Sequence, residues 1–492
     1  MKSNKMTRRS FVAASVGLPL GVGLPLGIAL PLGAATTAQA VSTVMLRLSA
    51  YMSEAGARAL PEEALEKTRQ HILDTFAAMV SGAELAPGRF AISFARAHSA
   101  EKIATVAASD VVCGAIEAAF ANAMLAHSDE TDDSHAPSES HPGASVVPAA
   151  LSAGEQFGID GPRFLRAIAL GYDVGTRFTM TVGAGAFQTP NHISTHALAG
   201  NFGSAAAAGC AAGLNQQQMR WLIDYASQQG SGIKTWQRDT DHIEKAFLFA
   251  GMPARNGITA ALLVQAGATG VDDVLSGQDN FLADYAPQAD AAKLIDQLGE
   301  RYEVTRTNIK KWTVGSPIQA PLDALEILLK RRPFEADQVQ SVTVRVGSSE
   351  AALVSNREMP DICMQHMIAV MLIDKTASFK AAHDKARMQD PAVLKQRAKV
   401  QLIPDAELER HLPAREAIVE VTLVDGSHLT ETVKAVRGTA ENPMPREEVI
   451  AKARDLMTPV LGAERCSNLI DSTMNLERLK SVRELRPLLQ RS

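Results

Sequence analysis

The chain has 492 residues, of which 46% are hydrophobic and 21% charged, a composition typical of a globular protein long enough for two or more domains. Its first 40 residues contain four basic and no acidic side chains, and the rest holds 45 basic and 54 acidic residues, a net charge of −9. This acidic balance argues against a nucleic-acid partner, although a local basic pocket could still bind an acidic substrate.

Residues 1–40 have the three-part design of an export signal. The twin-arginine pair Arg8-Arg9 precedes an apolar stretch in which Leu-Pro-Leu-Gly occurs three times, and Ala38-Gln39-Ala40 follows as a small-residue cleavage site. The alternative is an N-terminal membrane anchor, which the repeated Pro and Gly disfavour because they break a spanning helix. We therefore expect export to the bacterial periplasm, cleavage after Ala40, and no stable membrane association of the mature chain.

Beyond this segment, apolar residues recur at helical spacing. One helix is predicted from Pro61 to Gly82, and a second, with Asp110 as its N-cap, leads to His127. Further helices are predicted at 148–157, 162–179, 204–212 and 216–229. The cysteines lie in apolar or helical runs, which favours buried free thiols over disulfides. They are Cys113, Cys210, Cys363 and Cys466.

The stretch from His127 to His141 contains five carboxylates, three histidines and no large apolar side chain. Its Asp, Ser and Pro residues are typical of turns, so we predict a loop between helices and not a core segment. Repulsion among the carboxylates predicts raised pKa values for some of them if the loop is partly buried, with His135 and His141 sharing their protons. Such groups can take a proton from carbon and return it.

Two simpler interpretations of this loop stay open. A solvated acidic loop is common on protein surfaces. A divalent-metal site is also conceivable because carboxylates and imidazoles are metal ligands, but their spacing here matches no metal motif, and we expect none.

Three later stretches could hold an anion. His192 and His196 lie just ahead of a small-residue helix, where the N-terminus attracts negative charge, although single histidines are more often structural. Lys245 lies in a basic segment that could clamp carboxylates or could be ordinary surface charge. Lys310 and Ser316 belong to a Trp- and Gly-containing loop that precedes an amphipathic helix.

After that loop the pattern changes to strands. Val342, Val344 and Val346 alternate with polar residues, and two apolar runs flank Asp425-Gly426, which predicts a hairpin. We expect a mainly α protein in which residues 41–305 form an all-helical body, 306–440 an inserted α+β lid domain, and 441–492 helices that rejoin the body. The interface of two such layers is a usual place for a pocket.

The order of these segments resembles the MmgE/PrpD family of 2-methylcitrate dehydratases, cis-aconitate decarboxylases and related epimerases. The resemblance covers essentially all of the mature chain. It rests on Asp132-Asp133-Ser134 and His141-Pro142 in the loop, the Gly–Ala run from Gly200, and the Lys310 stretch. It implies a helical domain with an α+β lid, a homodimer, and neither a metal nor an organic cofactor.

The resemblance also implies functional positions. Glu130 stands where the family has Asp, Ser134 where it has Thr, and His141 at the later loop histidine. Lys245 falls within one residue of a family lysine, and Lys310 matches the lid lysine.

At two positions the chain departs from the family. A family histidine falls on Ser194 by strict counting, so His192 or His196 would have to serve after a small shift. The lid histidine of the decarboxylases is replaced by Gly315, which counts against cis-aconitate decarboxylation.

These residues predict a cofactor-independent lyase of the hydro-lyase type, acting on a small di- or tricarboxylate. It would abstract a proton next to a carboxylate and then expel water. Lys245 and Lys310 would bind the carboxylates, and His141, oriented by Glu130 or Asp132, would act as general acid or base.

Ser134, Asn201 and Ser316 would add hydrogen bonds to the substrate. The first alternative is an isomerase or epimerase on the same scaffold, with His192 or His196 as a second proton carrier. A non-catalytic periplasmic carboxylate-binding protein and a metal hydrolase are the remaining alternatives, and the latter predicts loss of activity to chelators.

Overall fold

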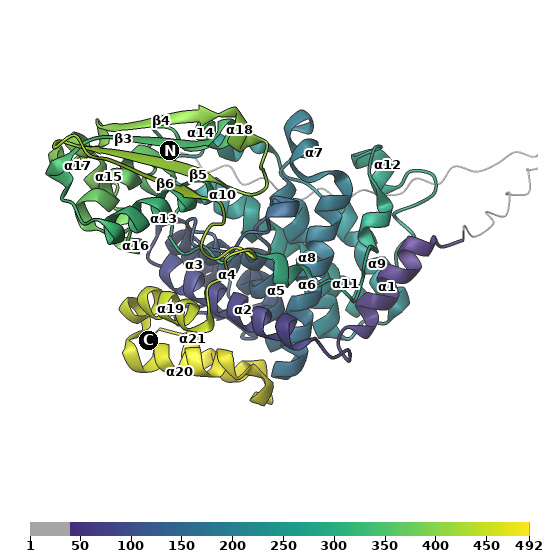
Figure 1. Ribbon diagram of the computed structural model, residues 1–492. Helices are drawn as coiled ribbons and strands as arrows, with labels where there is room; N and C mark the ends of the chain where they lie inside the picture. The colour runs from purple at the N-terminus through teal and green to yellow at the C-terminus, as the bar shows by residue number, and fades with distance from the viewer. Residues whose placement is uncertain (1–39, 492) are drawn as a thin grey trace, which may run out of the picture. The chain divides into compact units, whose positions relative to one another are not determined.

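The computed structural model describes residues 40–491, and from Val41 onward the chain forms one compact unit (Figure 1). Residues 1–39 of the predicted export signal lie outside the described range. Helices dominate the unit, and its strands form one four-stranded sheet and one short two-stranded ladder. The mainly α fold expected from the sequence is therefore confirmed.

The first part of the unit is a helical body whose apolar faces are buried against one another. Its helices are α1 (Thr43–Glu54), α2 (Glu62–Gly82), α3 (Ala86–Ala97), α4 (Ala115–Ala126), α5 (Pro142–Phe157), α6 (Gly161–Val182), α7 (Ala184–Asn191), α8 (Thr195–Ala212), α9 (Gln216–Gln228), α10 (Ile243–Ala246), α11 (Met252–Gln265) and α12 (Phe281–Tyr285). The helix predicted from Pro61 to Gly82 is α2, and the later predicted ranges correspond to α5, α6, α8 and α9.

The helix before the loop begins later than predicted. Its N-cap is Gly114, whereas Asp110 lies in the turn of a short antiparallel hairpin formed by β1 (Ala104–Thr105) and β2 (Val112–Cys113). The prediction of Asp110 as N-cap was wrong because an Asp ahead of an apolar run suits a tight turn as well as a helix start.

The second part of the unit contains the four-stranded sheet, in the order β4-β3-β5-β6, with β3 and β4 parallel and the other neighbours antiparallel. Its strands are β3 (Val339–Gly347), β4 (Val400–Asp405), β5 (Ala417–Leu423) and β6 (His428–Val433). Its helices are α13 (Ser316–Arg331), α14 (Ser348–Val354), α15 (Met364–Asp374), α16 (Phe379–His383), α17 (Pro391–Arg397) and α18 (Ala406–Glu409). The predicted hairpin joins β5 to β6. Strand β4 was not predicted, because only Asp405 in it is buried and it lacks an apolar alternation.

Two large hydrophobic cores lie in the described unit, together with a small third cluster of Ala197, Leu248 and Phe249. The first joins the body to α19 (Arg446–Leu461), α20 (Ala463–Met474) and α21 (Arg486–Leu489), and the second lies between the sheet and helices α13 and α15 (Figure 1). Helix α19 packs along α2, and its Lys452 Nζ donates to Asp74 Oδ1 at 2.6 Å and to the Thr131 carbonyl at 3.0 Å. The C-terminal helices thereby contact the loop that follows α4.

The described unit buries its cysteines and most of one long apolar helical stretch. All four cysteines are buried and free, as predicted. Among the described residues, the helical stretch Ile243–Gln265 is long and apolar enough to cross a membrane by length and composition alone, but 67% of its most apolar window is buried, as in a core helix.

Candidate active site

The loop between α4 and α5 is buried, contrary to expectation. Asp129, Glu130, Asp132 and Asp133 are each at most 4% exposed. Charged groups are costly to bury unless they are paired and hydrogen-bonded. The sequence prediction failed because it judged burial from the absence of apolar side chains, whereas partners from distant segments compensate the charges here.

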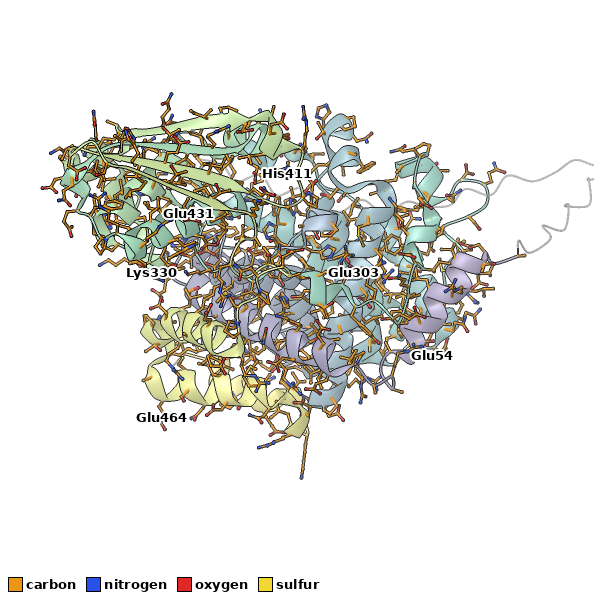
Figure 2. The ribbon with its side chains drawn as sticks, viewed as in Figure 1. Glu54, Glu303, Lys330, His411, Glu431 and Glu464 are labelled. Carbon is orange, nitrogen blue, oxygen red and sulfur yellow. The ribbon has the colours of Figure 1, made fainter. Side chains whose placement is uncertain are left out.

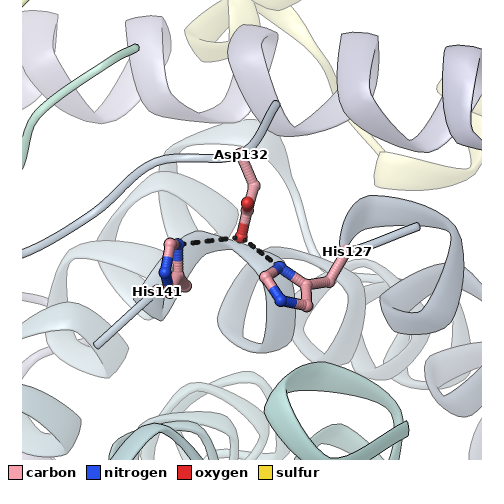
Figure 3. Close-up of side chains that lie close together, drawn as sticks. All are labelled: His127, Asp132 and His141. Atoms are coloured by element: carbon pink, nitrogen blue, oxygen red, sulfur yellow. Dashed lines mark hydrogen bonds and ion pairs between the residues drawn. The ribbon is translucent and has the colours of Figure 1, made fainter. Parts of the chain in front are cut away.

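Asp132 holds two imidazoles (Figure 3). Its Oδ2 lies 2.9 Å from His127 Nδ1 and 3.4 Å from His141 Nδ1, and His141 Nδ1 also lies 2.6 Å from the Asp133 carbonyl oxygen. A carboxylate and a carbonyl only accept hydrogen bonds, so Nδ1 carries the proton in both rings. The Nε2 atoms of His127 and His141 are therefore the nitrogens that can exchange a proton with a ligand.

Asp133 faces the opposite side of the loop. Its carboxylate accepts from His71 Nδ1 at 2.9 Å, Tyr172 Oη at 2.5 Å and the backbone N–H of Gly143 at 3.0 Å. These bonds fix the start of α5, where His141 is the N-cap. Asp133 is thus a positioning residue for His141.

Two lysines meet at Glu130. Lys245 Nζ forms an ion pair with Glu130 Oε1, and Lys310 Nζ donates to the Glu130 carbonyl at 2.8 Å and lies 3.4 Å from Oε2 and 3.6 Å from Asp132 Oδ1. Lys245 also lies over the Trp236 ring, 5.3 Å from its centroid. Glu130 therefore anchors both ammonium groups, and Asp132 rather than Glu130 orients His141.

These cations reverse the expected direction of the carboxylate pKa shifts. Burial alone would raise the pKa of Glu130, but Lys245 and Lys310 outweigh it and hold that pKa well below its usual range. Burial opposes ionisation of Asp132 in the same way, yet His127, His141 and Lys310 lower its pKa well below the usual value. The prediction of raised pKa values was thus wrong for both residues.

Lys245 is placed by an irregular helix. It lies in α10, which continues into a π-helical turn, Phe247–Gly251, before α11. A π turn accommodates one residue more than an α turn. The π turn here connects the short helix that carries Lys245 to α11.

His196 joins the imidazole cluster through Phe249. The His196 ring stacks on Phe249 with centroids 3.8 Å apart and lies 5.1 Å from the His141 ring. Burial and the nearby His141 and Lys245 lower the pKa of His196 well below its usual value. His192 instead lies exposed at the C-terminus of α7, apart from the cluster. Of the two alternatives, the fold brings His196 to the site.

Three residues expected to bind substrate have other surroundings. Asn201 Nδ2 donates to the Ala226 carbonyl at 2.7 Å and joins α8 to α9. Ser134 pairs through its backbone with Asn308, with N–O distances of 3.0 and 2.8 Å. Ser316 is half-buried in the first turn of α13. His135 was expected to share protons with the carboxylates of the loop, but its ring nitrogens contact Ser138 and Glu303 instead.

His135 is tied to the centre of the body. Its Nδ1 lies 2.8 Å from Ser138 Oγ and its Nε2 3.2 Å from Glu303 Oε2. Glu303, labelled in Figure 2, belongs to a turn that packs against α2 and α6. Both ring nitrogens of His135 are thereby occupied.

The structure adds three residues that sequence reasoning did not select. His383 Nε2 of α16 lies 2.9 Å from Asp129 Oδ2. Burial opposes protonation of the His383 ring, but Asp129 and the nearby Asp361 outweigh it and raise the pKa of His383 to about 9. Asp361 is buried, and burial raises its pKa to about 7. His242 precedes α10 and contacts His127, with ring centroids 5.3 Å apart. No local pattern could have identified these residues, because each reaches the loop from a separate segment.

Two triads of the described residues have ligand atoms close enough to share a cation: His127–Asp132–His141 and His127–Glu130–His242. In the first triad, His127 Nδ1–H donates to Asp132 and His141 Nδ1–H donates to the Asp133 carbonyl, so these nitrogens carry protons and do not offer a lone pair to a cation. In the second, Lys245 already places a positive charge on Glu130.

Comparison with known proteins places this architecture in a family. Residues 46–293 match the MmgE/PrpD N-terminal domain and residues 312–477 the MmgE/PrpD C-terminal domain, so the chain belongs to the MmgE/PrpD family and the resemblance predicted from the sequence is confirmed.

Its relatives include several named lyases. Cis-aconitate decarboxylase of Aspergillus terreus is 24% identical over 92% of this chain and 97% of its own length. Cis-aconitate decarboxylase of Homo sapiens is 25% identical over 88% and 91%. The 2-methylcitrate dehydratase-like protein oryR of Aspergillus oryzae is 23% identical over 58% and 62%.

Proposed function

We propose that this protein is a lyase that abstracts a proton next to a carboxylate of a small di- or tricarboxylate and then expels water. Its relatives are named as a decarboxylase of cis-aconitate and as a 2-methylcitrate dehydratase-like protein, which supports a carboxylate substrate. The observation that carries the proposal is the buried group in which Asp132 orients His127 and His141 beside Lys310.

The chemistry follows from these contacts. A carbon acid next to a carboxylate is weak, and its anion must be stabilised by preorganised positive charge and hydrogen-bond donors. Lys245 and Lys310 supply that charge, and both are buried, where a charge acts more strongly than in water. His141 accepts the proton at Nε2 while its Nδ1–H stays bound to the Asp133 carbonyl.

Expulsion of water fits the lid segment better than decarboxylation. The position implied for a histidine in decarboxylases is Gly315, the N-cap of α13, whose backbone N–H donates to the Asp361 carbonyl at 3.0 Å. No imidazole therefore comes from this position to assist loss of carbon dioxide. Product analysis with citrate, 2-methylcitrate and cis-aconitate separates the two lyase reactions.

The central test replaces His141 with Ala. A single general acid–base group contributes about 10²–10⁴-fold to turnover, so we expect a loss of that size with an unchanged unfolding transition. His428→Ala, in exposed strand β6, is the matched control and should retain full activity. Turnover of the His141 variant equal to that of the control would contradict the proposal.

A second candidate is an isomerase or epimerase. It is favoured by the proximity of His141 and His196, whose rings lie 5.1 Å apart and could serve opposite faces of one carbon. In deuterated water, exchange with inversion and no alkene would identify this reaction, whereas an alkene product identifies the lyase. A homodimer and periplasmic export also remain proposals, which light scattering and cell fractionation test.

A further inference from the structure

His242 is a buried histidine without partners. It is 5% exposed, and neither ring nitrogen has a hydrogen-bond partner among residues 40–491. Buried polar atoms in native proteins are almost always hydrogen-bonded, and an unpaired one costs free energy. A structural imidazole in this position would therefore be a poor choice for the fold.

The backbone of His242 adds a second cost. Its φ of +62° lies in the left-handed region, which non-glycine residues adopt infrequently. Such strain persists where the surrounding structure fixes it, and it clusters at ligand sites. Here the strained residue is the N-cap of α10, three residues ahead of Lys245.

The surroundings of His242 show what the unpaired nitrogens face. Ligand atoms of His242, His127 and Glu130 all lie within 4.8 Å of one another, and His127 Nε2 is likewise unpartnered among the described residues. Burial, Lys245 and His127 lower the pKa of His242 well below its usual value, so its ring is neutral near pH 7. A neutral imidazole offers one N–H donor and one acceptor.

We propose that His242 is a further catalytic residue, whose ring N–H donates to the substrate carboxylate oxygen that gains negative charge during proton abstraction. The inference rests on the proposed function. As the α-proton passes to His141 Nε2, the electron pair of the C–H bond moves into the carboxylate, which becomes a dianion. One of its oxygens would lie against Lys245 and His242, since these residues share the side of the cluster next to Glu130.

A divalent cation is the competing occupant of the same place. Lys245 is already paired with Glu130, and Lys310 lies 3.4 Å from its other oxygen, so a cation would meet two ammonium charges. A substrate carboxylate can instead compete with Glu130 for the two ammonium groups. The observations therefore favour an anion over a metal as the partner of His242.

The test compares His242→Asn with His192→Asn. Asn tolerates the left-handed backbone, and His192, with a φ of +57°, is an exposed histidine of the same conformation. Loss of one oxyanion donor lowers kcat by about 10²–10³-fold, so we expect that fall for His242→Asn with little change in KM or in unfolding temperature. His242→Gln, whose amide nitrogen can approximate Nε2, should recover part of the activity.

A binding measurement distinguishes failure of the His242 inference from failure of the proposed lyase activity. Ring ¹⁵N spectra are recorded while propane-1,2,3-tricarboxylate is added; we expect the His242 signals to shift, whether or not any substrate is turned over. Unshifted His242 signals, or a His242→Asn kcat equal to that of His192→Asn, would overturn the inference. An inactive wild type with shifted signals would contradict the proposed lyase only.

A metal titration covers the competing occupant. Zn²⁺ and Mn²⁺ are added to chelator-treated protein in a calorimeter. We expect no stoichiometric binding that depends on His242. Tight binding that His242→Asn abolishes would make His242 a metal ligand and overturn the proposed donor role.

Discussion

Replacing Lys310 with Met would leave the buried carboxylates of Glu130 and Asp132 short of one positive charge. Lys310 is 3% exposed, and its Nζ lies within 3.6 Å of Glu130 Oε2 and of Asp132 Oδ1. Met retains much of the apolar stem, so the change isolates the ammonium group. Removing one partner of a buried ion pair costs about 3–5 kcal/mol, and we expect a loss of unfolding free energy in that range.

The assay is urea denaturation of the purified protein, read as a shift of the midpoint at constant slope. Lys311→Met is the matched control, because Lys311 is adjacent in the chain but pairs with Glu326 at 2.6 Å near the surface, with its side chain 24% exposed. A pair so placed contributes about 0–1 kcal/mol. The two neighbouring lysines should thus differ severalfold in their effect on stability.

A double variant checks the cause. If the cost of Lys310→Met comes from uncompensated charge, Glu130→Gln should offset part of it, with a coupling of about 0.5–3 kcal/mol. Lys310→Met and Lys311→Met with equal destabilisation would refute the reasoning. Additive effects of Lys310→Met and Glu130→Gln would refute the specific pairing with Glu130.

Two other predictions follow from contacts away from the reacting atoms. The pKa of His383 is raised from 6.5 to about 9 by its pairing with Asp129, so the stabilisation it gives is complete below pH 6.5 and lost as the pH rises through 9. Denaturation measured across this range should show declining stability, which His383→Gln flattens. A Cβ added at Gly161 would clash with the carbonyl oxygen of Leu476, so Gly161→Ala should destabilise the fold by about 3 kcal/mol in urea denaturation.

The controls for these two predictions differ. Asp361 cannot serve as the control because its carboxyl helps to raise the pKa of His383, so the control is His428→Gln in β6, an exposed histidine whose replacement should leave the alkaline decline in place. Gly56→Ala is the match for Gly161, since its Cβ would meet Arg163 at an ordinary 3.6 Å. A flat alkaline profile in the wild type, or equal stability of the two alanine variants, would contradict the respective argument.

Local patterns in the sequence determined the elements and the family. The period of apolar residues predicted α2, and the Asp425-Gly426 turn predicted the β5–β6 hairpin, because spacing and turn chemistry depend on neighbouring residues alone. The motifs around Asp132 and His141, together with the Gly–Ala run from Gly200 and the Lys310 stretch, predicted the family. Strand β4 escaped because a half-exposed edge strand carries no clear alternation.

The tertiary structure alone decided the state of the site. Lys245 and Lys310, which lie 115 and 180 residues away in the sequence, both contact Glu130. These contacts compensate the buried charge of Glu130 and lower the pKa of its carboxyl. His242 acquired significance in the same way, because its unpaired nitrogens become visible only once its neighbours are placed. Burial and electrostatics are sums over all surrounding atoms, so the order of residues along the chain could suggest the chemical groups but not their ionisation or their partners.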